Sequence, residues 1–175
     1  MGADRDLPSG LLSVIDHVGV AVPDLDAAIA FHTGVLGWRL VSREDNVEQG
    51  VAEAMLAATA AGDGTQLQLI APLDDSSPIA RFLDRSGPGL QQLAYRVDDV
   101  ERVSRVLRSA GLRLLYDLPK PGTRGSRINF IHPKDTGGVL IELVEPPDGT
   151  DSRSRPERGV QVGRVQNADA GEEHT

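Results

Sequence analysis

The sequence has no cysteine and few aromatic residues, which make up 3% of its 175 residues. Without thiols the chain can form neither disulfides nor thiolate metal sites. Its apolar runs are too short to span a membrane, and its polar start, MGADRDLPSG, has no hydrophobic signal-peptide core. The formal net charge of −8 argues against nucleic-acid binding, which needs a basic face. These absences predict a soluble, cytoplasmic protein without nucleic-acid or membrane partners.

Composition also separates the two ends of the chain from its middle. Residues 1–12 are a short polar lead, and the stretch from Pro147 onward has no aromatic residue and few large apolar ones. Such a segment cannot bury enough surface to offset the entropy of ordering it. We therefore expect a flexible N-terminal lead at 1–12, a globular domain at 13–146 and a disordered C-terminal tail at 147–175.

The globular part nearly repeats itself. An offset of 75 residues carries IDHVGVAVPDL, which starts at Ile15, onto LQQLAYRVDDV, which starts at Leu90, and an offset of 74 carries QLIAP onto ELVEP. Alternating apolar residues, N-capping aspartates and closing glycines predict a strand, a helix and three more strands in each copy. The later strands are expected near 39–45, 50–59 and 65–72, and near 112–117, 126–132 and 138–145, with a connecting helix in SPIARFLDRSG. The fold class is therefore α+β, with tandem βαβββ modules at about 13–75 and 88–146.

Strand alternation places four polar side chains at equivalent positions of the repeat. Alternate residues of a strand point to opposite faces of its sheet, and the faces of His17 and Gln92 carry a small neighbour, glycine or alanine, that leaves room for a ligand. Gln68 and Glu142 match each other in the last strands. If the modules meet about a pseudo-twofold axis, one imidazole, two amides and one carboxylate can hold a divalent ion in a cleft. The alternative is that these side chains are only hydrogen-bonded or face solvent.

Several strings resemble those of one family. IDHVGVAVPDLDAAIAF, EQGVAEAML, GPGLQQLAYRVDDV and SRINFIHPKDTGGVLIELVEP resemble motifs of the methylmalonyl-CoA epimerases, in order and spacing, over about 14–146. The resemblance implies the vicinal oxygen chelate (glyoxalase-like) fold with a metal-binding cleft. It implies a divalent ion, most often cobalt, with Mn²⁺, Ni²⁺, Zn²⁺ or Mg²⁺ as alternatives, held by His17, Gln68, Gln92 and Glu142. The family usually has GLHH where this chain has GLQQ, so an amide replaces a histidine ligand, and the identity and affinity of the metal stay open.

The same resemblance implies the chemistry. The reaction would be the epimerisation of methylmalonyl-CoA, an isomerase reaction that removes the α-proton and returns it through a metal-stabilised enolate. Glu53, in EQGVAEAML, is implied as one acid/base residue. Glu142 is either the second one or only a ligand, and Glu48 is a competing candidate in a predicted turn. The expected partner is an acyl-CoA substrate, and the expected assembly is a homodimer.

Other readings stay open from the sequence. Arg127, Asn129, His132 and Lys134 could meet the substrate carboxylate or CoA phosphates, or could form only a solvated strand edge. The enzyme could instead be an epimerase of another alkylmalonyl-CoA or a glyoxalase-type enzyme. The chain could also be a non-catalytic, ligand-binding protein of the resistance type with the same fold.

Overall fold

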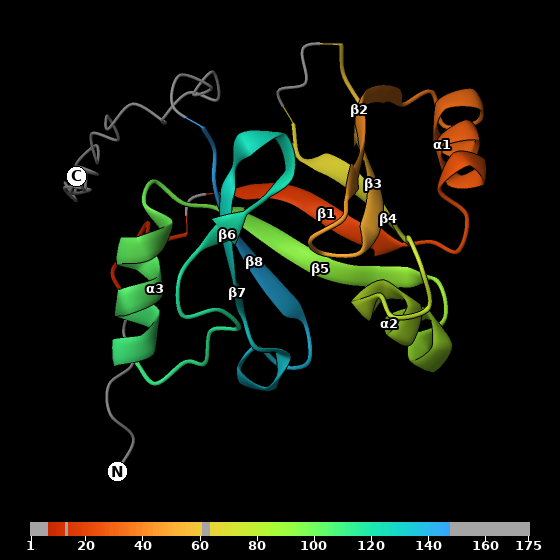
Figure 1. The fold of residues 1–175 in the computed structure, drawn as a ribbon. Coiled ribbons are helices and arrows are strands. Elements are labelled where there is room, and N and C mark those ends of the chain that lie inside the picture. The colour runs from red at the N-terminus through yellow and green to blue at the C-terminus, as the bar shows by residue number, and fades with distance from the viewer. Residues whose placement is uncertain (1–6, 13, 61–63, 148–175) are drawn as a thin grey trace, which may run out of the picture.

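A computed structural model describes residues 7–12, 14–60 and 64–147, which form two consecutive modules (Figure 1). The first contains β1 (Ile15–Ala21), α1 (Leu25–Gly34), β2 (Arg39–Asn46), β3 (Val51–Ala57) and β4 (Gln66–Pro72). Helix α2 (Pro78–Ser86) leads into the second, which contains β5 (Gly89–Arg96), α3 (Val100–Ser109), β6 (Lys120–Pro121), η1 (Thr123–Gly125), β7 (Arg127–Ile131), η2 (Pro133–Asp135) and β8 (Leu140–Glu145). The predicted tail lies, beyond Pro147, outside the described residues.

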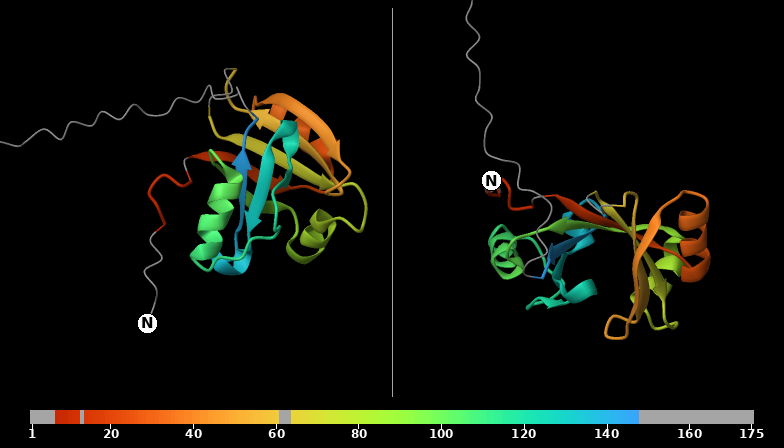
Figure 2. Two further views of the ribbon diagram at one scale, coloured as in Figure 1. Left: turned by 60° about the vertical axis from the view of Figure 1, so that its left-hand side comes forward. Right: turned by 90° about the horizontal axis from the view of Figure 1, so that it is seen from above.

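The strands of the described residues join one sheet in the order β2-β3-β4-β1-β5-β8-β7-β6. The first strands of the two modules, β1 and β5, lie antiparallel at its centre, and each pairs in parallel with the last strand of its own module. Seen from above, the sheet is curled, and α1 and α3 cover its outer face at opposite ends (Figure 2). The predicted α+β architecture of tandem modules is therefore confirmed.

The hydrogen-bonding register reproduces the sequence repeat. Gly19 of β1 pairs with Gln68 of β4, and Ala94 of β5 pairs with Glu142 of β8. Gly19 and Ala94 differ by the offset of 75, and Gln68 and Glu142 by the offset of 74. The pseudo-twofold relation between the modules thus extends to the pairing of individual residues.

Each outer helix packs on the apolar face of its own module. The cluster under α1 includes Leu25, Ala54, Leu56 and Leu69, and the cluster under α3 includes Val103, Leu107, Ile141 and Leu143. Asp24 caps α1 by accepting a hydrogen bond from the Ala27 amide at 2.9 Å, and Asp99 caps α3 in the same way from Arg102 at 2.8 Å. Because these faces of the strands pack on the helices, the alternate residues face the other side of the sheet.

The described part of the N-terminal lead packs on the second module. Leu11 is buried in the cluster under α3, and Leu7 and Leu12 contact it. Three leucines within six residues give this segment enough apolar surface to dock, although its neighbours are polar. The sequence pattern did not indicate these contacts, and the flexibility expected for residues 1–12 stays a prediction.

Within the described residues, no helix is both long enough and apolar enough to cross a membrane.

The strand predicted at 112–117 is wrong. Leu114 makes only an isolated bridge to Ile131, and the next regular pairing is the two-residue β6. The buried side chain of Asn129 takes the place of a strand partner, because its Oδ1 accepts from the Tyr116 amide at 3.2 Å and its Nδ2 donates to the Tyr116 carbonyl at 3.0 Å. Pro119 also lacks the amide hydrogen that a continuing strand would need.

Candidate active site

The inner face of the sheet borders a cleft of about 400 Å³ between the two modules. Strands of both modules line it, and Pro78 and Ile79 of α2 close one side. Its polar lining includes Glu53, Gln68, Gln92 and Glu142, and its apolar lining includes Val51, Ile70, Leu115, Ile128, Phe130 and Leu140. A cleft of this kind, largely apolar with a few convergent polar groups, is the usual form of a small-molecule site.

The structure brings the four predicted ligands together. Gln92 Nε2 donates to Glu142 Oε2 at 2.5 Å and to Gln68 Oε1 at 3.1 Å. His17 Nε2 lies 3.1 Å from the same Glu142 oxygen. The four residues, called the donor cluster below, are only 4% to 6% exposed. Their side chains therefore contact one another on one face of the sheet instead of facing solvent.

Gly19 is required for this arrangement. It pairs with Gln92 across β1 and β5, and a Cβ added at Gly19 would lie 2.5 Å from Cγ of Gln92. The small residue predicted beside His17 does leave room, but the Gln92 side chain occupies that room. Any larger residue at position 19 would push Gln92 out of the donor cluster.

The imidazole of His17 lies between two carboxylates. Its Nδ1 is 3.1 Å from Asp16 Oδ1 on one side, opposite the Glu142 contact of Nε2. Burial by itself would lower the pKa of His17, but the hydrogen bonds to Asp16 and Glu142 outweigh it and raise the pKa to about 9. Burial would likewise raise the pKa of Asp16, but hydrogen bonds from His17 and Arg96 lower it to about 2. The cluster therefore favours a positive charge between Asp16 and Glu142.

Glu53 lies beside the donor cluster, on β3. Its Oε2 accepts a hydrogen bond from Gln68 Nε2 at 2.6 Å, and its Oε1 accepts one from Thr123 Oγ1 at 2.8 Å. The side chain is buried, with 4% exposure. Burial raises the pKa of Glu53, the two hydrogen bonds oppose that effect, and the nearby charges of Glu44 and Glu142 add to it. A buried carboxylate with a raised pKa beside a cleft is a typical acid/base candidate.

The donor cluster fits a divalent ion. No group of three His, Cys, Asp or Glu among the described residues could hold a metal, so a metal here needs the two amides as ligands. His17 Nε2 and Glu142 Oε2 are 3.1 Å apart, close to the roughly 3 Å that separates neighbouring ligands around an ion with bonds of about 2.1 Å. The bond to Glu53 already turns the oxygen of Gln68 toward the cluster, and a half-turn of the Gln92 amide would present its oxygen as well.

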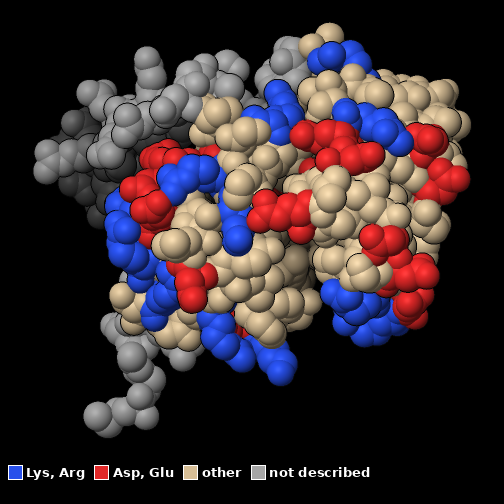
Figure 3. Space-filling model, viewed as in Figure 1, with Lys and Arg blue, Asp and Glu red and all other residues tan. Residues whose placement is uncertain are grey.

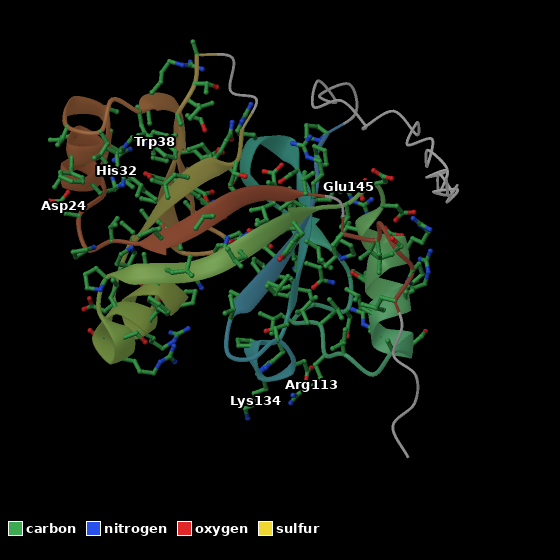
Figure 4. The ribbon with its side chains drawn as sticks, turned by 180° about the vertical axis from the view of Figure 1, so that it is seen from behind. Asp24, His32, Trp38, Arg113, Lys134 and Glu145 are labelled. Carbon is green, nitrogen blue, oxygen red and sulfur yellow. The ribbon has the colours of Figure 1, made fainter. Side chains whose placement is uncertain are left out.

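The other residues weighed from the sequence lie elsewhere. Glu48 lines the cleft mouth, where its exposed carboxylate pairs with Lys120 Nζ at 3.6 Å. The cleft lining does not include the four polar residues of the strand and its exit, Arg127, Asn129, His132 and Lys134. Arg127 pairs with Glu101 and Glu145. Asn129 binds the 112–117 segment, and the His132 side chain caps η2. Lys134 lies near Arg113 at the far end of the second module (Figure 4).

Three residues of the site could not be predicted from the sequence pattern. Thr123 reaches Glu53 from 70 positions away, and Arg96 donates to Asp16 from 80 positions away. Lys120 lines the cleft from the short strand β6, which replaces the predicted strand. Asp16 could have been noticed as the neighbour of His17, but strand alternation would have sent it to the opposite face.

Comparisons with known proteins agree with this fold. Residues 16–130 match the glyoxalase/bleomycin resistance protein/dioxygenase superfamily. The ethylmalonyl-CoA/methylmalonyl-CoA epimerase of Cereibacter sphaeroides is 35% identical over 77% of this chain and 99% of its own length. The crystal structure of methylmalonyl-CoA epimerase from Mycobacterium tuberculosis is 55% identical, with a TM-score of 0.75, over 82% of this chain and 95% of that one. A variant of the Streptomyces coelicolor methylmalonyl-CoA epimerase, in complex with 2-nitronate-propionyl-CoA, is 41% identical, with a TM-score of 0.73, over 78% and 99% of the two chains.

Proposed function

The chain belongs to the methylmalonyl-CoA epimerase family of the glyoxalase superfamily and is an enzyme of the isomerase class, and we propose that it interconverts the 2R and 2S forms of methylmalonyl-CoA. The resemblance and the vicinal oxygen chelate fold predicted from the sequence motifs are confirmed. The relatives named above are epimerases of this substrate, and one of them is in complex with a related acyl-CoA. The substrate, the metal and the roles of individual residues are the proposal.

One observation carries the proposal: a buried carboxylate and the donor cluster share one cleft and are joined by a single amide. Gln68 donates to Glu53 at 2.6 Å and accepts from Gln92 at 3.1 Å. A substrate whose thioester and carboxylate oxygens faced the donor cluster would therefore hold its α-carbon beside Glu53. Such placement of base and substrate can supply much of the rate enhancement of a proton transfer.

We assign the metal to His17, Gln68, Gln92 and Glu142. Members of the superfamily typically bind a divalent metal, and Co²⁺ is our choice among the candidate ions. When bound, the ion would supply Lewis acidity at the thioester oxygen, which is worth on the order of several kcal/mol when negative charge develops there. Of the four side chains, Glu142 contributes the one negative charge, and Gln92 stands where the family usually has a histidine.

The proton transfers are assigned to two carboxylates. Glu53 accepts the α-proton as its C–H bond breaks, and the electron pair moves toward the thioester carbonyl. A second group returns a proton on the opposite face of the same carbon. We assign that role to Glu142, because its contacts with His17 and Gln92 both use Oε2 and leave Oε1 outside them. The raised pKa of Glu53 brings its basicity closer to that of the activated α-carbon, which favours transfer in both directions.

The surroundings of the cleft suit an acyl-CoA. Lys120 lies at the mouth, and Arg81 and Arg85 are exposed on α2, which forms one side of the cleft. Acidic and basic side chains are interspersed over this face of the molecule, with a group of basic ones over α2 (Figure 3). An acidic protein can bind an anionic substrate through such a local basic group. The apolar lining around Phe130 is compatible with a methyl or an ethyl branch on the substrate.

The assembly is proposed to be a homodimer. Phe31, Val35 and Leu36 are exposed by 52%, 70% and 52% on or just after α1, and Leu40 of β2 is exposed by 39%. Exposed large apolar side chains on neighbouring elements are common at subunit interfaces. Light scattering after gel filtration should give twice the chain mass of 18.7 kDa. The cytoplasmic location stays a prediction from the sequence.

The decisive experiment is isotope exchange. Purified protein is incubated with methylmalonyl-CoA of one configuration in deuterated water, with and without added Co²⁺ and with a chelator. We expect deuterium at C2 together with inversion, and a loss of both after chelation that Co²⁺ restores. If neither epimer of methylmalonyl-CoA exchanges its α-proton under any of these conditions, the proposed reaction is wrong, and exchange from ethylmalonyl-CoA alone would point to the other alkylmalonyl substrate. Exchange that persists after full chelation would overturn the metal dependence alone.

A further inference from the structure

Both strands at the centre of the sheet contain a β-bulge, and the two bulges are related by the sequence repeat. Ile15 pairs with Tyr95 but His17 pairs with Ala94, so Asp16 is an extra residue of β1. Gly19 pairs with Gln92 but Val20 pairs with Leu90, so Gln91 is the extra residue of β5. Asp16 and Gln91 differ by the repeat offset of 75, and each directly precedes a member of the donor cluster.

The bulge turns the side chain of Asp16 toward the neighbouring imidazole. In a regular strand Asp16 and His17 would point to opposite faces, whereas a bulge re-aims the side chain of its extra residue. Asp16 Oδ1 lies 3.1 Å from His17 Nδ1, and Arg96 of the second module holds Oδ2 with Nε at 3.0 Å and Nη2 at 2.6 Å. Asp16 is 8% exposed, so this arrangement is built into the interior.

The second bulge has the same backbone but different chemistry. Gln91 lines the cleft, and its buried Oε1 has no hydrogen-bond partner among the described residues. Gln92, the residue that it precedes, is instead held by Gln68 and Glu142 of the donor cluster itself. A residue outside the donor cluster, Asp16, therefore holds His17, whereas the equivalent Gln91 does not hold Gln92.

We propose that Asp16 is a positioning residue that fixes the ring of His17, and that Arg96 fixes Asp16 in turn. The inference rests on the metal site of the proposed function. An Nδ1–H that donates to Asp16 sets the ring plane and leaves Nε2 as the coordinating atom, aimed at Glu142 and the cluster. Outer carboxylates of this kind typically contribute about 10–100-fold to metal affinity at histidine sites.

The test measures Co²⁺ affinity by calorimetry, with the metal salt alone as the probe, in Asp16→Ala and Asp16→Asn. The matched control is Asp135→Asn. Asp135 accepts hydrogen bonds from Arg113 Nε at 3.0 Å and Nη2 at 2.6 Å, as Asp16 does from the same two nitrogens of Arg96, and neither Asp135 nor Arg113 lines the cleft. We expect about a 10–100-fold weaker affinity for Asp16→Ala. Asp16→Asn, which keeps an acceptor oxygen for Nδ1–H, should lose less, and Asp135→Asn should bind as the wild type does.

A purely structural role would give a different pattern. Loss of an interior ion pair alone would lower the melting temperature of the metal-free protein and leave the Co²⁺ affinity of the folded fraction unchanged. Equal affinities in the wild type and both Asp16 variants would overturn the proposal, as would an equal loss in Asp135→Asn or a wild type that binds no Co²⁺. If Asp16→Ala does not fold, Asp16→Asn carries the test, and wild-type affinity in that variant overturns the proposal. A wild type that binds Co²⁺ but exchanges no α-proton would overturn only the proposed reaction.

Discussion

The two modules share a frame but differ in what the frame carries. Met55 of β3 pairs with Gln68, and Phe130 of β7 pairs with Glu142, so the position of Glu53 in the first module is occupied by Ile128 in the second. The first module thus contributes a carboxylate to the cleft where the second contributes an apolar side chain. The symmetric positions are those that bring donors together, and in the proposed reaction the asymmetric ones would distinguish the two faces of the substrate.

The hairpins next to these positions differ as well. The first module has a full hairpin of β2 and β3, with eight and seven residues. In the second, β6 has two residues, and the turn after it carries Thr123 across the cleft to Glu53. A repeat can therefore keep the pairing of its central strands while its outer hairpins diverge. The proposed epimerisation needs one group on each face of the substrate carbon, one acting as base while the other acts as acid, and divergent hairpins can place two carboxylates at positions that the repeat does not relate.

The largest expected effect follows from Glu53→Gln. The variant has no proton acceptor at position 53, just as the second module has none at the equivalent Ile128. Turnover should fall by about 10²–10⁴-fold, because an amide is no base. Metal content should stay unchanged, since the new amide oxygen can still accept from Gln68. Exchange should slow more from one epimer than from the other. Turnover, bound metal by elemental analysis and exchange from each pure epimer are measured together.

The comparison variant for this prediction is Glu142→Gln. It removes the negative charge of the donor cluster and should lower metal retention, which Glu53→Gln should not. If Glu53→Gln turned over at the wild-type rate, the acid/base assignment would be wrong, and Glu48 at the cleft mouth would be tested next.

Much of this frame could be predicted from the sequence because a repeat doubles every signal. His17 matches Gln92 at an offset of 75 and Gln68 matches Glu142 at an offset of 74, and strand alternation puts all four on one face. The predicted βαβββ order and both capping aspartates follow from equally local patterns. These features depend on residues a few positions apart, or on the comparison of one copy with the other.

The rest could not be predicted, because it depends on contacts between residues that are distant in sequence and on breaks in alternation. The contact of Thr123 with Glu53 spans 70 positions, and that of Arg96 with Asp16 spans 80. The bulges at Asp16 and Gln91 interrupt the period of two that the prediction assumes. The strand expected at 112–117 failed because its backbone pairing is limited to Arg113 and Leu115, and at Tyr116 a buried side chain, Asn129, replaces the backbone partner.

The next largest effect is expected in stability, at Asn129 in the divergent part of the second module. Asn129→Ala should lower the free energy of unfolding by about 1–3 kcal/mol, because the amide of Tyr116 loses its partner and the carbonyl of Tyr116 is left with Arg108 Nη2. Ser104→Ala is the control, since it removes only the hydroxyl that accepts from Asn129 Nδ2 at 3.2 Å. Urea unfolding of the three proteins gives the values. An equal loss in both variants would show that Asn129 does not support the 112–117 segment.

A smaller effect is expected from Gln92→His, which restores the match between Gln92 and His17 across the repeat. Imidazole is a better donor than an amide for late first-row ions, so Co²⁺ affinity should rise by about tenfold. Gln91→His is the matched control, because it adds the same ring one position away, at the bulge. Calorimetry with Co²⁺ measures both. An unchanged or weaker affinity in Gln92→His would mean that position 92 is not a ligand in this chain.

The smallest expected effect concerns the one hydrogen bond that the second module gives to Glu53. Thr123→Val keeps the shape of the side chain and removes the hydroxyl that donates to Glu53 Oε1 at 2.8 Å, whereas Thr123→Ser keeps the hydroxyl. Hydrogen bonds to charged groups contribute about 1.5–3 kcal/mol, but Gln68 still holds the other oxygen, so we expect a loss of about three- to tenfold in kcat for Thr123→Val. KM and metal content should not change, and Thr123→Ser should recover most of the rate. The two directions must lose the same factor in kcat/KM, because their ratio is the equilibrium constant, but Thr123 approaches Glu53 and not Glu142, so exchange of the α-proton with solvent should slow more for the epimer whose proton Glu53 removes. Equal losses of solvent exchange from both epimers, or a Thr123→Ser variant as slow as Thr123→Val, would show that the turn shapes the cleft as a whole and does not orient the carboxylate of the first module.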